Sequence, residues 1–254
     1  MAGASATVLI ALGLLGLVGG IGITAVGPGG VLPTIGLFAL TSLSPAQVAG
    51  TAVVTHVATG ALATAAYTRS GQLREPATRR TAVVLSLAAL AGTPLGVLVN
   101  SSVSQRMFGI VLGVLVAGAA GLVLLRERRA AAVPRAHPST PTVAVLGFSV
   151  AVAAGIVGIG GPMLTVPLLV ALGVPVLESL AAAQAQSVVV AGVGTLGYVA
   201  HGAVDWPLAA LVGVPELAGV LLGWRIARAL PARHLKYALV TTLFALAPYL
   251  ALHG

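Results

Sequence analysis

The chain has 254 residues, of which 58% are hydrophobic and only 7% are charged. Soluble domains carry roughly 25% charged residues, so this composition excludes an ordinary water-soluble protein and predicts an all-α polytopic membrane protein. The formal net charge is +8, but the cations lie in short clusters between apolar runs, a pattern typical of membrane topology signals and not of nucleic-acid binding. No cysteine and no metal, catalytic or nucleotide motif is present, so we expect no metal, no cofactor and no enzyme activity.

Apolar runs come in the same order in both halves of the chain: one long run, a glycine-rich break, a short run and three further long runs. A membrane-spanning helix needs about 20 apolar residues, and most of the long runs approach that length. The first cation is Arg69, so we expect no cleaved signal peptide and a first run that stays in the protein. The predicted runs are 5–26, 31–43, 46–68, 81–99 and 107–125, then, after a polar linker at 126–142, 143–158, 162–173, 178–200, 206–223 and 236–252.

The two halves match each other at a constant shift of 131 positions over a long block. The first break, Gly27-Pro28-Gly29-Gly30, corresponds in this way to the second, Gly158-Ile159-Gly160-Gly161. Constant spacing of this kind indicates a duplication, so we predict two homologous transmembrane repeats, at 1–125 and 143–254. Further matched pairs are Thr34 with Thr165, Tyr67 with Tyr198, and Gly71 with Gly202.

Twelve of the 13 Lys and Arg residues lie in three basic segments, 69–80, 126–142 and 224–236. Basic loops tend to stay in the cytoplasm. All three segments face the cytoplasm if the repeats are inverted and each makes an odd number of crossings, with the short run as a partial span. Both termini and Arg106 are then external. Eight spans arranged as two parallel repeats are the alternative.

Each glycine-rich break places irregular backbone at membrane depth, which is tolerated only where protein or a water-filled cavity satisfies its polar groups. The short run after each break then begins as a half-helix with free N–H groups, and a helix N-terminus attracts anions. Two such ends near the midplane predict an anion-binding site, an arrangement found in transporters with inverted repeats. The alternative is that the glycines only permit close helix packing.

Polar residues at the breaks and in the helices that follow them are the candidate substrate-binding residues. Large polar groups are costly inside a membrane unless they are partnered or functional. Hydrogen bonds between helices, or for threonine a bond to its own helix, are the alternative. The candidates are Gly29, Gly30, Thr34, Thr51, Thr55, His56, Gly160, Gly161, Thr165, Gln184, Gln186 and Ser187.

Glu216 is the only acidic residue well inside a predicted span. Intramembrane carboxylates often carry protons in coupled transport, so Glu216 is the candidate for proton coupling. A structural partnership with Arg225, or a position nearer the membrane interface, is the alternative.

The two breaks are joined by further repeated features: a Tyr-x-x-x-Gly loop and a Gly-x-x-x-Gly helix in each half, with Pro167 and Leu230-Pro231. This pattern resembles the sulfite exporter TauE/SafE family of bacterial membrane permeases over nearly the whole chain except 126–142. The resemblance implies movement of a small sulfur anion such as sulfite, a sulfonate or thiosulfate, often outward, and of carboxylates in some relatives. The step that often reads Gly-Thr-Ser in the family appears here as Gly50-Thr51-Ala52 and as Ala183-Gln184-Ala185, which leaves the substrate open.

We therefore expect a secondary transporter in the cell membrane that moves a small anion by alternating access of its two repeats. No ATP-binding motif is present, so an ion gradient or the substrate gradient drives it. A passive channel for a small ion or solute is the alternative. The expected partners are the anion, the lipid bilayer and a coupling proton or other ion, and homo-oligomerisation is left open.

Overall fold

The computed structural model describes residues 5–104, 106–111, 113–115, 117–118, 121, 138–231, 234, 237–238 and 241. Throughout these residues the regular structure is helical, and six helices are long and apolar enough to cross a membrane, so the prediction of an all-α polytopic membrane protein is confirmed. These six are α1 (Ala6–Ala25), α3 (Pro45–Arg69), α4 (Pro76–Asn100), α6 (Thr140–Val157), α8 (Val176–Ala200) and α9 (Trp206–Ala229). The shorter elements are η1 (Pro28–Gly30), α2 (Val31–Leu40), η2 (Gln72–Arg74) and α7 (Pro162–Ala171).

Capping residues, more than apolarity, determine where several helices begin. Ser44 and Gln47 form a reciprocal capping box at the start of α3, and the Ser139 side chain caps α6. Helix α4 begins at Pro76, because proline suits a first helical turn, in which the N–H groups lack partners. The predicted starts at 81 and 143 are therefore too late, since they follow the apolar residues alone.

The long helices also extend past the apolar core of a bilayer. Helices α3, α4 and α8 each have 25 residues, or about 37 Å at 1.5 Å per residue, against a hydrocarbon thickness of about 30 Å. The basic segment predicted at 224–236 is accordingly helical up to Ala229. Arg225 and Arg228 thus lie on the last turns of α9 and not in a loop, where long cationic side chains can reach the interface.

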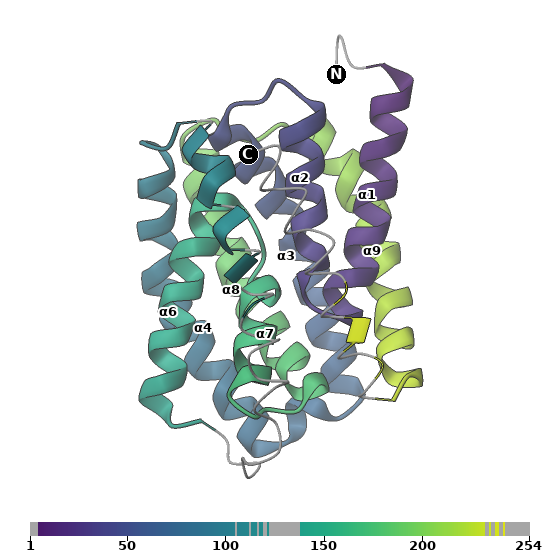
Figure 1. Ribbon diagram of the computed structural model, residues 1–254, viewed down its shortest axis with the longest axis vertical. Helices are drawn as coiled ribbons and strands as arrows, with labels where there is room; N and C mark the ends of the chain where they lie inside the picture. Colours follow the sequence, from purple (N-terminus) through teal and green to yellow (C-terminus); the bar gives the residue numbers. More distant parts are fainter. Residues whose placement is uncertain are drawn as a thin grey trace.

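Both glycine-rich breaks reverse the direction of the chain inside the protein. Helix α1 ends at Ala25, and Gly27 takes a φ of 105°, which favours glycine. Helix α2 then runs antiparallel to α1, so that Gly19 faces Pro33 and Gly36 faces Leu12. Figure 1 shows α2 returning toward the end at which α1 begins, and α7 returning toward the end at which α6 begins. The short runs are therefore half-helices, as predicted.

The two halves of the chain are interleaved. Helix α1 packs along α9, α4 packs along α6, and α3 packs along α8 in the centre. In the first two of these contacts the backbones of the two helices approach closely at glycines. A Cβ at Gly20 would lie 2.1 Å from the carbonyl oxygen of Glu216, and a Cβ at Gly96 would lie 2.2 Å from the carbonyl oxygen of Val152. In the predicted repeats α1 corresponds to α6, and α4 corresponds to α9. The α1–α9 contact and the α4–α6 contact are therefore equivalent, as duplication requires. Helices α1 and α6 start from opposite ends (Figure 1), which favours the inverted repeat, itself still a prediction.

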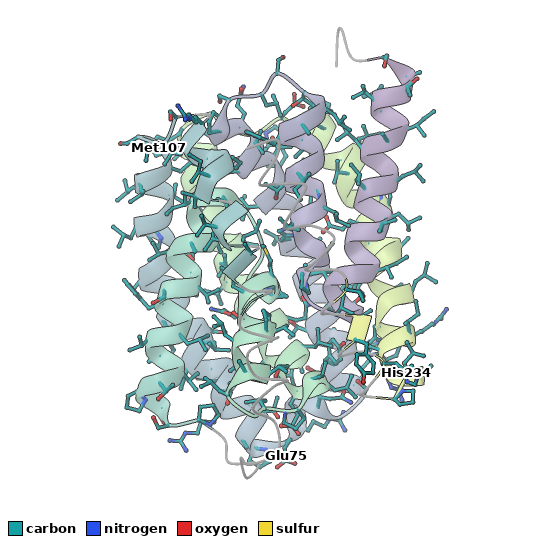
Figure 2. The ribbon with its side chains drawn as sticks, viewed as in Figure 1. Glu75, Met107 and His234 are labelled. Atoms are coloured by element: carbon teal, nitrogen blue, oxygen red, sulfur yellow. The ribbon has the colours of Figure 1, made fainter. Side chains whose placement is uncertain are left out.

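Glu75 and His234, from two of the predicted basic segments, lie toward one end of the molecule, and Met107, beside Arg106, lies at the other (Figure 2). If basic segments stay in the cytoplasm and Arg106 is external, the two groups must lie at opposite ends, as they do. Which end faces the cytoplasm stays a prediction. Other predictions about charge and membrane spans concern residues outside the described ones. These are Arg126, Arg128, Arg129, Arg135, Arg233 and Lys236, the linker 126–142 up to residue 137, parts of 107–125 and almost all of 236–252.

Candidate anion-binding site

The two breaks meet in the interior of the protein. Gly27, Gly30, Gly158 and Gly160 are all buried. A Cβ at Gly27 would lie 2.8 Å from the Cβ of Val166 on α7, so the first break rests directly on the half-helix that follows the second. The arrangement predicted from the sequence, two broken helices that come together, is thus present within the described residues.

His56 of α3 lies between the two breaks, and its orientation follows from its neighbours. A Cβ at Gly30 would lie 3.5 Å from Cε1 of the imidazole, and one at Gly160 would lie 3.4 Å from Cδ2. Nε2 is the ring atom between Cε1 and Cδ2, so it points into the space between the breaks. It has no hydrogen-bond partner among the described residues.

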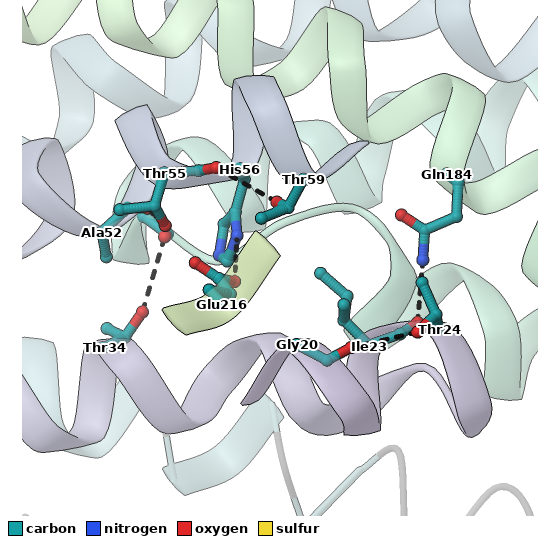
Figure 3. Close-up of polar contacts among 11 residues, drawn as sticks. Gly20, Ile23, Thr24, Thr34, Ala52, Thr55, His56, Thr59, Gln184 and Glu216 are labelled. Atoms are coloured by element: carbon teal, nitrogen blue, oxygen red, sulfur yellow. Dashed lines mark hydrogen bonds and ion pairs between the residues drawn. The ribbon is translucent and has the colours of Figure 1, made fainter. Parts of the chain in front are cut away.

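The opposite nitrogen of His56 faces Glu216 of α9 (Figure 3). Nδ1 lies 3.1 Å from Oε1 of the carboxylate, and both side chains are 0% exposed. The distance suits an ion pair, although the angles do not meet those of a hydrogen bond, and neither carboxylate oxygen has another partner within the described part of the chain. A buried carboxylate is costly in a membrane unless it is paired. His56, and not Arg225, is the partner that the fold provides for Glu216.

The start of α7 presents free backbone donors to the same space. The N–H groups of Ile159, Gly160 and Gly161 donate no hydrogen bond to any described residue, and all three residues are buried. The hydroxyl of Ser187 on α8 is also buried and without a partner there, and lies 2.8 Å from the point that a Cβ at Gly160 would occupy. Free N–H groups at a helix N-terminus, a hydroxyl and an imidazole nitrogen together form a set of donors suited to an anion.

Several predicted site residues instead bond to other parts of the protein. Thr165 donates to Oε1 of Gln186 at 2.5 Å, and the amide of Gln186 donates to the carbonyl of Gly147 at 3.2 Å, which ties α7, α8 and α6 together. Gln184 donates to the carbonyl of Ile23 at 2.8 Å (Figure 3). These bonds agree with the alternative interpretation that the glutamines link helices. A direct role of the glutamines in binding the anion stays a prediction.

The three remaining threonines of the prediction also have structural partners. Thr51 accepts a hydrogen bond from the backbone N–H of Asp205 at 2.9 Å, beside the start of α9. Thr55 donates to the carbonyl of Ala52 in its own helix at 2.9 Å. Thr34 donates to the carbonyl of Gly158 at 3.5 Å, a long bond that links the two breaks.

Two of the predicted glycines face away from His56. A Cβ at Gly29 would lie 2.4 Å from the backbone of Gly22, so Gly29 lets η1 pack closely on α1. A Cβ at Gly161 would lie 3.1 Å from Oε1 of Gln186. The residues gathered around the free donors are therefore Gly30, His56, Gly160 and Ser187, and Glu216 contacts the other side of the His56 ring.

Two tyrosines hold the broken helix ends, which the sequence pattern alone did not reveal. The hydroxyl of Tyr67 donates to the carbonyl of Thr24 at 2.6 Å, and that of Tyr198 donates to the carbonyl of Gly155 at 2.6 Å. Helix C-termini leave carbonyl groups without partners, and both tyrosines satisfy one. Their equal positions in the two halves were a signal of this shared role.

The chain matches a known protein family over almost its whole length. The family described as sulfite exporter TauE/SafE matches residues 12–250. This chain belongs to that family. It is accordingly a membrane transporter, and the resemblance seen in the sequence is confirmed.

Curated relatives of this TauE/SafE family member are named as transporters without a substrate. A "Probable membrane transporter protein" of Xylella fastidiosa strain 9a5c is 27% identical over 231 residues, which cover 89% of this chain and 83% of the relative. A protein of the same name from strain Temecula1 is 29% identical over 160 residues, which cover 61% of this chain and 59% of the relative. No solved structure matches the chain.

Proposed function

We propose that this TauE/SafE family member is a secondary transporter for a small anion and that the anion binds between the two breaks. The observation that carries the proposal is the buried N-terminus of α7, whose N–H groups at 159–161 have no partner among the described residues. Gly160 in this segment lies beside the imidazole of His56 and the unpartnered Ser187 hydroxyl. Buried donors without acceptors are costly. An anion with several oxygen atoms would satisfy them together.

A small sulfur oxyanion such as sulfite, a sulfonate or thiosulfate fits this donor set best. Its three oxygen atoms can accept bonds from the α7 N-terminus, from Ser187 and from His56 at the same time. The family to which the chain belongs is described by sulfite export, which supports the same class. A short carboxylate has only two oxygens and is the second candidate, and a passive channel for a small ion is the third.

Alternating access would move groups of helices that combine both halves of the chain. Backbone-close glycine contacts join α1 to α9 and α4 to α6, so each of these pairs would move as a unit. The two breaks lie between the pairs, and His56, Ser187 and Glu216 are 0% exposed. The anion site is therefore closed to water on both sides, and opening it to one side requires one helix pair to tilt relative to the other.

Transport by the purified chain in proteoliposomes tests the proposed substrate class. We expect exchange of labelled sulfite, thiosulfate or methanesulfonate well above the rate in protein-free liposomes, and slower exchange of acetate. Saturation and counterflow distinguish a transporter from a channel, whose flux would exceed what alternating access permits. If none of these anions moves under any gradient, the proposed function is wrong.

The proposed orientation is testable because the chain has no cysteine of its own. Single cysteines at Glu75, Ser101 and Leu230 occupy exposed positions. With inverted repeats and cytoplasmic basic segments, a membrane-impermeant maleimide added to intact cells should label position 101, and should label positions 75 and 230 only after permeabilisation. Labelling of position 230 from outside would support parallel repeats instead.

A further inference from the structure

Among the described residues, the contact between His56 and Glu216 has few ionisable groups on the elements around it. Helices α1, α2, α6 and α7 contain no Asp, Glu, Lys, Arg or His between their described bounds. On the helices that pack against the pair, the remaining ionisable groups lie near helix ends or have structural partners. They are Arg69 and Tyr67 on α3, Arg79 and Arg80 on α4, Glu178 and Tyr198 on α8, and Arg225 and Arg228 on α9.

The two nitrogens of His56 face different chemical environments. Nδ1 faces the Glu216 carboxylate at 3.1 Å, and this contact favours the tautomer that carries its proton on Nδ1. Nε2 faces the space between Gly30 and Gly160 of the two breaks. Without a second proton, Nε2 presents a lone pair to the anion site and the pair has a net charge of −1. With that proton, Nε2 presents an N–H and the pair is neutral.

We propose that His56 takes up one proton at Nε2 with each transported anion, and that Glu216 is the positioning residue that makes this protonation favourable. This proposal rests on the proposed function and adds its coupling ion. The proton comes from water on the side where the anion enters, forms an N–H bond at Nε2, and returns to water when the anion leaves. No other bond forms or breaks.

The charge balance explains why both ions would move together. An anion next to an unprotonated pair adds negative charge to a buried site that already holds a carboxylate, which is costly at membrane depth. Protonated His56 adds an N–H donor and a positive charge beside the anion. The empty site with a charge of −1 and the loaded site with a monovalent anion then carry the same net charge, so one anion and one proton cross without net charge movement.

The test uses the full-length chain in proteoliposomes, with labelled methanesulfonate, sulfite and thiosulfate as separate probes and the membrane potential clamped at zero. Methanesulfonate stays ionised at every pH used, so its own protonation cannot imitate coupling. When the outside is one pH unit more acidic than the lumen, the wild type should accumulate this monovalent anion up to about tenfold inside the liposomes. The E216Q variant should lose this accumulation by a larger factor than it loses anion exchange, because a neutral amide does not stabilise the imidazolium.

Two further variants separate positioning from structural effects. E216D keeps a carboxylate and should keep accumulation, and E75Q makes the same change at an exposed position and should behave as the wild type. The rate of exchange should fall with rising pH in the wild type with a one-proton dependence, and E216Q should lose that dependence.

Each outcome bears on one proposal. If the wild type exchanges an anion but the pH gradient drives no accumulation, or if E216Q still accumulates it, the proton proposal is wrong and the proposed function stands. Loss of exchange in both E216Q and E216D also counts against the proton proposal, because it indicates a structural pair. If no anion moves through the wild type, both proposals fail.

Discussion

Replacing Gly160 by alanine is expected to reduce anion exchange by about 5- to 150-fold without unfolding the protein. The new methyl group would lie 2.8 Å from the Ser187 hydroxyl and 3.4 Å from Cδ2 of His56, in the space assigned to the anion. Overpacking typically costs about 1–3 kcal/mol, which corresponds to that range of rates if the cost falls on the loaded state. The φ of Gly160 is not positive, so alanine suits the backbone, and the Ser187 side chain can rotate away.

The matched control is G192A on α8, where a Cβ would meet nothing within 4 Å. Initial rates of labelled sulfite exchange measure the effect, and size-exclusion elution checks that the variant is folded. The G192A rate should equal that of the wild type. A G160A variant that exchanges sulfite at the wild-type rate would show that the anion does not bind at the second break.

The breaks could be predicted from the sequence because their cause is local. Gly27 and Gly158 take φ values of 105° and 68°, which side chains rarely adopt, and a run too short to span follows each of them. The half-helices, the long helices and the family resemblance all follow from such local patterns. The match between Tyr67 and Tyr198 likewise pointed to a shared structural position, although it did not say what their hydroxyls bind.

The pairing of His56 with Glu216 could not be predicted, because 159 residues separate them and no periodic pattern links α3 to α9. From the sequence, Arg225, nine residues further along the chain, is only an alternative partner for Glu216. The contact of α1 with α9 and of α4 with α6 depends on which glycine faces which backbone, and this too is a property of the packed helices. The moving units proposed above therefore differ from the two sequence repeats.

Replacing Gly20 by alanine is expected to destabilise the protein by about 1–3 kcal/mol. A methyl group there would lie 2.1 Å from the carbonyl oxygen of Glu216 and 3.0 Å from the backbone nitrogen of Val220. Both atoms belong to the backbone of α9 and cannot rotate away, so α9 must move outward along its contact with α1. The midpoint of thermal unfolding in detergent should fall by about 3–10 °C.

The control for this change lies seven residues away on the same helix. A Cβ at Gly13 would meet its nearest atoms at 3.9 and 4.0 Å, an ordinary contact, so G13A should leave the unfolding midpoint unchanged or raise it. Both variants gain the same helix propensity, about 1 kcal/mol over glycine, and the difference between them therefore isolates the α1–α9 packing. Because the displaced oxygen belongs to Glu216 itself, the shift of α9 also disturbs the contact between Glu216 and His56. G20A should consequently lose proton-driven accumulation more severely than anion exchange, whereas equal midpoints for G20A and G13A would mean that α1 and α9 do not pack this closely.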